Sequence, residues 1–118
     1  MQIPRKNIAA YYRQMQIETA SSKKQIVMLH EKLFVLVREA IIGDKSESRS
    51  RLDQAQNILS QLEIALKVEE ETDVSHSLFL LYDYIYSKLE GGDIRTHREG
   101  LKLISELNDT FRELYKRI

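Results

Sequence analysis

The chain has 118 residues, enough for one domain that buries its own hydrophobic core. Hydrophobic residues at 42% and charged residues at 31% argue against disorder, and a formal net charge of zero excludes a global field that would attract nucleic acid or cations. The absence of cysteine excludes disulfides and thiolate metal sites and fits a reducing cytosol.

The first residues, MQIPRKNIAAYY, lack the apolar run of a secretory signal. Pro4 suits the first turn of a helix, and Ile8, Tyr12 and Met15 fall on one face, so residues 1–18 are expected to form a short amphipathic segment. No later stretch is both long and apolar enough to span a bilayer, so we expect a cytoplasmic protein without membrane insertion.

Four long helices are expected to follow, because apolar residues recur at helical spacing and glycine and proline are scarce. Gly43 and the pair at 91–92 mark two helix ends. Start signals are Ser21 or Ser22, Asp44 with Glu47, Thr72 or Asp73, and Thr96 with Glu99. The expected helices are 22–42, 46–67, 73–90 and 96–117.

Short connections between successive helices favour antiparallel packing. The predicted fold class is therefore all-α: an antiparallel up-down four-helix bundle over residues 19–118, preceded by the short N-terminal amphipathic segment. The whole chain, 1–118, is expected to form a single domain, with residues 1–18 as a capping segment.

The first long helix is more apolar than one core-facing stripe requires, since twelve of the seventeen residues from 26 to 42 are apolar. With one stripe turned inward, the apolar residues left over are Val27, Phe34, Val35 and Ile41 or Ile42. Tyr82, Tyr84 and Tyr86 likewise point from several faces of their helix. Burial of two faces of a central helix would account for part of this excess, and an apolar groove that receives another polypeptide accounts for all of it.

The chain offers little for catalysis, and we expect neither an enzyme nor a cofactor nor a metal. The stretch HEKLF at 30–34 lacks the second histidine of a zinc-protease motif, and no histidine has a glutamate three residues before it, as a di-iron bundle requires. Asp83 lies among tyrosines. A hydrogen bond to a neighbouring hydroxyl explains this position better than a carboxyl group with a raised pKa in a pocket does. The stretch RSR at 49–51 is the only compact basic patch, and a solvated helix face explains it better.

At YRQMQIETASSKKQIVML, from Tyr12 to Leu29, the chain resembles the FliS family of flagellar secretion chaperones. The likeness continues through AQNILSQLEIAL (55–66) and LFLLYDYIYSKL (78–89) and closes with ISELNDTFRELY (104–115). It covers nearly the whole chain, in order and with similar spacing. Departures stand at Ser22, Lys24, His30 and Phe111, where the family pattern usually has proline, glutamate, tyrosine and tryptophan.

The resemblance implies a cytosolic chaperone that binds the C-terminal region of flagellin, prevents premature polymerisation and holds the subunit for the flagellar type III export apparatus. It leaves open whether the empty chaperone forms a homodimer. Leftover apolarity and matched positions together predict that these residues contact the partner: Tyr12, Ile17, Val27, Phe34, Tyr82, Tyr84 and Tyr86. A further hypothesis is that the N-terminal segment covers part of the apolar groove until flagellin displaces it.

Two alternatives remain open at this point. A general helical adaptor would ignore flagellin. A histidine phosphotransfer module would use His76. This residue begins an H-x-L stretch like that of phosphotransfer proteins, but Phe79 and Leu80 stand where those proteins usually have lysine and glycine.

Overall fold

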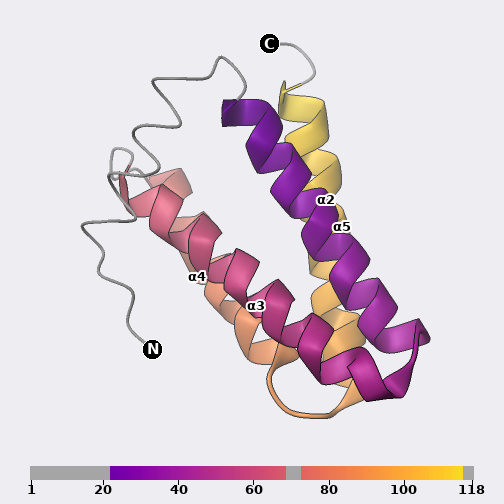
Figure 1. Cartoon of the computed structure of the whole chain (residues 1–118). Coiled ribbons are helices and arrows are strands. Elements are labelled where there is room, and N and C mark those ends of the chain that lie inside the picture. The colour runs from indigo at the N-terminus through magenta and orange to yellow at the C-terminus, as the bar shows by residue number, and fades with distance from the viewer. Residues whose placement is uncertain (1–21, 69–72, 116–118) are drawn as a thin grey trace.

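The structure, a computed structural model, describes residues 22–68 and 73–115. Within these two ranges the regular structure is helical, without strands: α2 Ser22–Ile42, α3 Lys45–Val68, α4 Asp73–Leu89 and α5 Ile94–Tyr115. The four predicted helices are confirmed to within two residues at either end. In Figure 1 the chain descends along α2, returns along α3, descends along α4 and returns along α5.

An aspartate caps the N-terminal end of each of the two helices α3 and α5. The Oδ1 atom of Asp44 accepts the backbone N–H of Ser46 at 3.0 Å, so Asp44 caps α3 as predicted. This hydrogen bond holds the pKa of the Asp44 carboxyl below its usual value. Asp93 caps α5 in the same way, accepting the N–H of Arg95 at 2.9 Å. The predicted cap at Thr96 is wrong, because α5 already begins at Ile94.

The turn between α4 and α5 is tied to α3. Gly91 has φ 74°, a left-handed conformation that costs glycine little, and it is the second residue after the end of α4 at Leu89. The Arg49 guanidinium donates to the carbonyl oxygens of Leu89 at 3.3 Å and Gly91 at 3.2 Å, and to Gln56 Oε1 at 3.0 Å. Arg49 therefore caps the C-terminal end of α4. With Arg51 paired to Glu47 at 2.7 Å, the stretch at 49–51 is a structural element rather than a basic patch.

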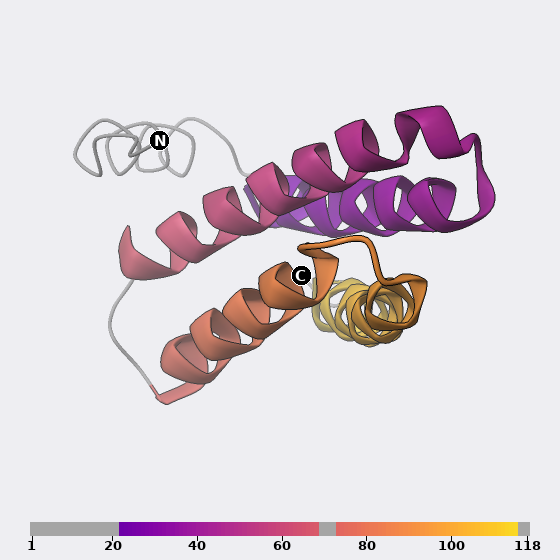
Figure 2. The same ribbon diagram turned by 90° about the horizontal axis from the view of Figure 1, so that it is seen from below.

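The helices pack as a ring in which α2 and α4 each contact both α3 and α5. Because α2 and α4 share at most a weak contact, they lie across the diagonal of the ring. Figure 2 looks almost along α5 while α3 and α4 run across the view, so α5 crosses these two helices. The core consists of apolar side chains from all four helices, including Leu33, Val37, Leu52, Leu59, Ile85, Leu89, Ile104 and Leu107.

One close approach between helices depends on a missing side chain. A Cβ atom at Gly100 of α5 would lie 3.2 Å from Leu89 Cδ2 of α4, tighter than ordinary van der Waals contact. Glycine here lets α5 press against the end of α4. The same junction is held on its surface by an ion pair between Lys88 and Glu99, 2.7 Å apart.

Candidate partner-binding surface

A buried histidine joins three helices. His30 of α2 is fully buried, and its Nδ1 lies 2.8 Å from the carbonyl oxygen of Ile26. A carbonyl oxygen only accepts, so Nδ1 carries the proton and donates. Nε2 is then an acceptor, and the Tyr82 hydroxyl of α4 donates to it at 2.8 Å. The ring of Phe111 from α5 stacks on the His30 ring, with centroids 4.4 Å apart.

Burial sets the charge of this histidine. Removal of the ring from water lowers the pKa of His30, and the hydrogen bond to the Ile26 carbonyl offsets only part of that effect. His30 is therefore neutral at neutral pH, which suits its hydrogen bond from the Tyr82 hydroxyl. The cluster of His30, Tyr82 and Phe111 therefore joins α2, α4 and α5 inside the core.

The outer side of α2 carries a row of exposed apolar side chains, here called the α2 strip: Met28, Val35 and Ile42. They are 57%, 45% and 69% exposed. Their spacing of seven residues is close to two helical turns, so they fall on one side of the helix. Single exposed apolar residues are ordinary, but an aligned row along a helix marks a surface suited to a polypeptide partner.

A second row, the α4 strip, consists of Leu80 and Tyr84, four residues apart on one face of α4. Leu80 is 54% exposed and Tyr84 is 51% exposed. The Lys88 ammonium lies 5.1 Å from the centroid of the Tyr84 ring, within range of a cation–π interaction that orients it. Because α2 and α4 lie across the diagonal of the ring, their outward strips face different sides of the molecule.

Apolar side chains are also only partly covered at one end of the bundle, where α2 and α4 begin and α3 and α5 end. This half-buried end contains Ile26, Leu29, Leu66, Leu78 and Leu81, all partly buried against the core. Among the described side chains, the fully buried ones nearest this end are His30 in α2, Leu62 in α3 and Tyr82 in α4.

Two amide oxygens lack a hydrogen bond within the described part of the chain: Gln25 Oε1, in the first turns of α2, and Asn108 Oδ1, one turn before Phe111 in α5. Asn108 is 7% exposed, so water reaches it poorly. A buried acceptor without a donor costs about 1–3 kcal/mol. A segment that supplies an N–H donor to Gln25, the less buried of the two residues, would recover part of that free energy.

The described residues were also compared with the requirements of a metal site and of a membrane span. None of their histidine and carboxylate side chains forms a cluster of three that could hold a metal ion. His76 and Asp83 are both exposed on α4. None of the described helices is long and apolar enough to cross a membrane.

Comparison with known proteins places this chain in a family. The family model for the flagellar protein FliS matches residues 5–118. The chain belongs to the FliS family. It is also 28% identical over 109 residues to the flagellar secretion chaperone FliS of Bacillus subtilis (strain 168), covering 89% of this chain and 80% of that protein. No solved structure matches it.

The residues predicted to contact a partner are not equivalent in this FliS-family structure. Tyr84 is exposed, whereas Val27, Phe34 and Tyr86 are partly buried against the core. These four keep an accessible portion, and partner contact remains a proposal for them. Tyr12 and Ile17, together with the capping segment at 1–18, lie outside the described residues.

Tyr82 requires a correction. It is 1% exposed and lies in the core, where its hydroxyl donates to His30 and its ring lies near the His30 ring, with centroids 5.7 Å apart. Helical position alone did not distinguish it from its neighbours Tyr84 and Tyr86. The hydrogen-bonding partner that draws it inward is 52 residues away in the sequence.

Sequence reasoning missed Met28 and Leu80 as exposed apolar residues. The available signal was spacing: Met28 lies seven residues before Val35, and Leu80 lies four before Tyr84. Of the apolar residues assigned as left over on α2, Val35 and Ile42 are exposed, while Ile41 is 8% exposed and joins the core.

Proposed function

We propose that this FliS-family protein is a cytosolic export chaperone. It binds the C-terminal region of flagellin, prevents premature polymerisation and holds the subunit for the flagellar type III export apparatus. The single observation that carries the proposal is the pair of exposed apolar strips on α2 and α4 of a chain that belongs to the FliS family. The name of its Bacillus subtilis relative, a flagellar secretion chaperone, supports the same function.

The placement of the strips favours an extended client. A rigid globular partner would meet one side of the bundle, and the two strips face different sides. A segment that is disordered when free can follow the surface from one strip to the other and fold as it binds. The free energy spent on ordering it keeps the complex releasable, which a chaperone that hands its client to an export apparatus requires.

The half-buried end offers a route between the strips. Its partly buried leucines and isoleucine come from three different helices, α2, α3 and α4. The unpaired oxygen of Gln25 adds an acceptor that an incoming backbone or amide side chain can satisfy. Client binding would then combine apolar burial with a small number of orienting hydrogen bonds, as is usual for polypeptide recognition.

The test is calorimetric titration of the chaperone with a peptide from the C-terminal region of flagellin of the same organism. We expect stoichiometric binding with a negative heat-capacity change, because apolar surface is buried. A peptide of the same composition in scrambled order is the first control. Absence of heat with the true peptide would reject flagellin as the client and favour the general adaptor.

Variants then connect the binding to the two strips. Val35→Asp on α2 and Leu80→Asp on α4 place a charge in each strip and should each weaken binding about tenfold or more, equivalent to about 1.4 kcal/mol. Gln54→Asp introduces the same charge at an exposed position of α3 outside both strips and should leave the affinity unchanged. If all three variants bind the peptide as tightly as the wild-type chain does, the client binds a surface outside both strips.

A further inference from the structure

Two exposed lysines alternate with apolar residues of the α2 strip. Lys24, Met28, Lys32 and Val35 follow one another at intervals of four, four and three residues, so they lie along one face of α2. Neither lysine is in an ion pair within residues 22–68 and 73–115. The part of the strip at Met28 and Val35 therefore stands beside unpaired positive charges.

The two glutamates of the same stretch of α2 do not balance these lysines. Glu31 accepts from Arg112 of α5 at 3.3 Å, and Glu39 lies 3.5 Å from Arg38 of its own helix. Each glutamate is thus matched by an arginine. The charge left over beside this part of the strip is that of the lysines.

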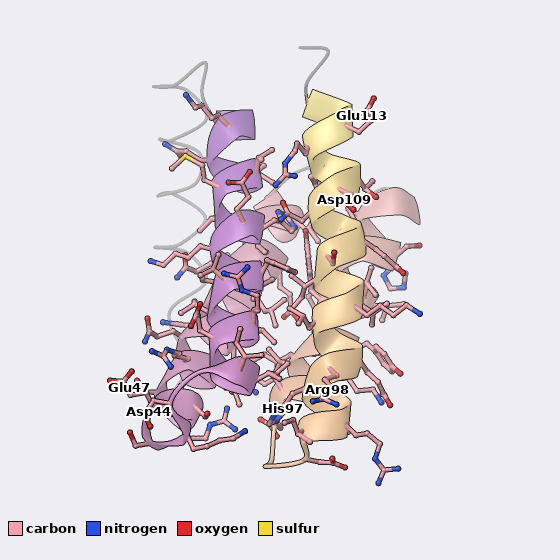
Figure 3. All side chains as sticks on the ribbon, turned by 90° about the vertical axis from the view of Figure 1, so that its right-hand side faces the viewer. Asp44, Glu47, His97, Arg98, Asp109 and Glu113 are labelled. Carbon is pink, nitrogen blue, oxygen red and sulfur yellow. The ribbon has the colours of Figure 1, made fainter. Side chains whose placement is uncertain are left out.

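Two more acidic residues lie past the other end of the α2 strip. Figure 3 shows α2 beside α5, with Asp44 and Glu47 near the lower end of α2. Both follow Ile42 in the sequence, and Ile42 lies ten residues after Lys32. Ten helical residues span about 15 Å, more than the Debye length of about 8 Å at physiological salt. These acids therefore leave the basic character of the first half of the strip unchanged.

The α4 strip has acidic residues beside it. Asp83 lies three residues after Leu80 on α4, and Glu90 directly follows the end of the helix. Both are exposed, and neither is in an ion pair in the described part of the chain. The cation on the other flank of the strip, Lys88, is matched by Glu99 at 2.7 Å. The α4 strip therefore stands beside unpaired negative charges.

Forces within the helices do not explain these charges. The N-terminal end of a helix carries partial positive charge, which disfavours Lys24 in the first turn of α2. The C-terminal end carries partial negative charge, which disfavours Glu90 after α4. Lys32 and Asp83 have no opposite charge three or four residues away, where ion pairs within a helix form. Opposite unpaired charges beside two exposed apolar strips are instead suited to selecting a polypeptide by its charge.

We propose that the two strips select different parts of one client. The α2 strip takes a segment in which apolar residues alternate with acidic residues, and the α4 strip takes a segment in which apolar residues alternate with basic residues. Lys24 and Lys32 determine specificity on α2, and Asp83 and Glu90 determine it on α4. This inference rests on the proposed chaperone function and adds the orientation of the client, because a chain laid the opposite way would bring like charges together.

The apolar strips supply most of the affinity, and the charges decide which segment binds to which strip. Exposed ion pairs are individually weak, and salt screens them, whereas burial of apolar surface persists in salt. The preference of each strip for one charge should therefore be clear in about 20 mM salt and largely lost in about 500 mM salt.

Two synthetic helical peptides test this selection without flagellin. They share one apolar face and differ only in the flanking residues, which are glutamates in one peptide and lysines in the other. Each is titrated into the full-length chain in about 20 mM salt, and shifts of backbone amide NMR signals show where it binds. We expect the glutamate peptide to perturb α2 around Met28 and the lysine peptide to perturb α4 around Tyr84.

Charge reversal then tests the selecting residues. Lys32→Glu should weaken binding of the glutamate peptide about threefold to tenfold, because the attraction of an exposed pair becomes repulsion. Asp83→Lys should weaken binding of the lysine peptide to a similar extent. The matched controls Lys102→Glu and Asp109→Lys make the same substitutions at exposed positions of α5, outside both strips, and should leave both affinities unchanged. Circular dichroism checks that each variant keeps its helical content.

The outcomes separate this inference from the proposed function. Model peptides that sort to opposite strips, with no binding of the flagellin peptide, would retain the selection by charge and reject flagellin as the client. Flagellin binding with both model peptides on the same strip would retain the chaperone and overturn the selection. Absence of binding by either model peptide at millimolar concentration, or equal effects of the strip variants and their controls, would also overturn it.

Discussion

At the scale of single residues, two departures from the family pattern contact each other. His30 and Phe111 stack at 4.4 Å, and the Tyr82 hydroxyl completes the hydrogen bonding of the histidine. A histidine needs a donor for its second nitrogen, and Tyr82 supplies it from the core. Sequence analysis identified His30 and Phe111 as unusual but could not pair them, because 81 positions separate them and helix periodicity carries no information across that distance.

The neutral state of His30 predicts a dependence of stability on pH. The unfolded chain binds a proton at His30 near pH 6.5, whereas the fold lowers the pKa of the buried ring. Below about pH 6.5 the unfolded state therefore holds more protons, and the free energy of unfolding rises with pH. The stability that depends on a neutral His30 is fully present above about pH 6.5 and is lost as the pH falls toward the pKa of His30 in the folded state.

Urea unfolding at about pH 7.5 and about pH 5.5 measures this contribution. The comparison is with His30→Gln, whose amide can donate to the Ile26 carbonyl and accept from Tyr82 without titrating. The wild-type chain should lose more stability between the two pH values than the variant does. An equal loss in both proteins would show that His30 does not titrate differently on folding.

At the scale of helices, periodicity predicted the four elements well because apolar residues recur at helical spacing in each and glycine and proline are scarce. The residue that caps the N-terminal end of α5 was harder to predict. Thr96 with Glu99 has the spacing of a capping box, but Glu99 instead binds Lys88 of α4. His97 donates from Nε2 to the Gly91 carbonyl oxygen at 3.0 Å, which holds the turn so that Asp93 is the capping residue. Tertiary contacts decide between two locally adequate caps.

Replacement of the two candidate caps distinguishes them. Asp93→Ala removes the acceptor for the Arg95 N–H and should lower the free energy of unfolding by about 1 kcal/mol. Thr96→Ala removes only the hydroxyl that donates to the Asp93 carbonyl oxygen and should cost less. Urea midpoints at constant slope give both values. A larger loss for Thr96→Ala would reverse the assignment of the cap.

At the scale of the whole molecule, the ring of helices places the α2 strip and the α4 strip on different sides. Local pattern predicted surplus apolar residues on both helices. It could not predict which of them face solvent, because that depends on which helices become neighbours. Tyr82 and Ile41 turned inward for this reason, and Met28 and Leu80 remained outside.

The two-sided arrangement predicts a dependence of affinity on client length. A flagellin peptide long enough to reach only one strip should bind at least tenfold more weakly than one that spans both, a difference of about 1.4 kcal/mol. Val35→Asp should then weaken one short peptide and spare the other, while Leu80→Asp should do the reverse. Titration of nested peptides tests this. Full affinity from a single short peptide would contradict a wrapped client.

The uneven depth of the core has a consequence for how this protein opens. The fully buried side chains of α2, α3 and α4 lie between the turns and the level of His30 and Tyr82, and beyond that level the described apolar side chains of these helices are at most partly buried. Local unfolding starts where few apolar contacts must be broken, so the first and last turns at the half-buried end can fray while the turn end stays folded. We therefore expect the bundle to rearrange at this end without crossing the barrier to global unfolding, which would suit the proposed uptake and release of a client.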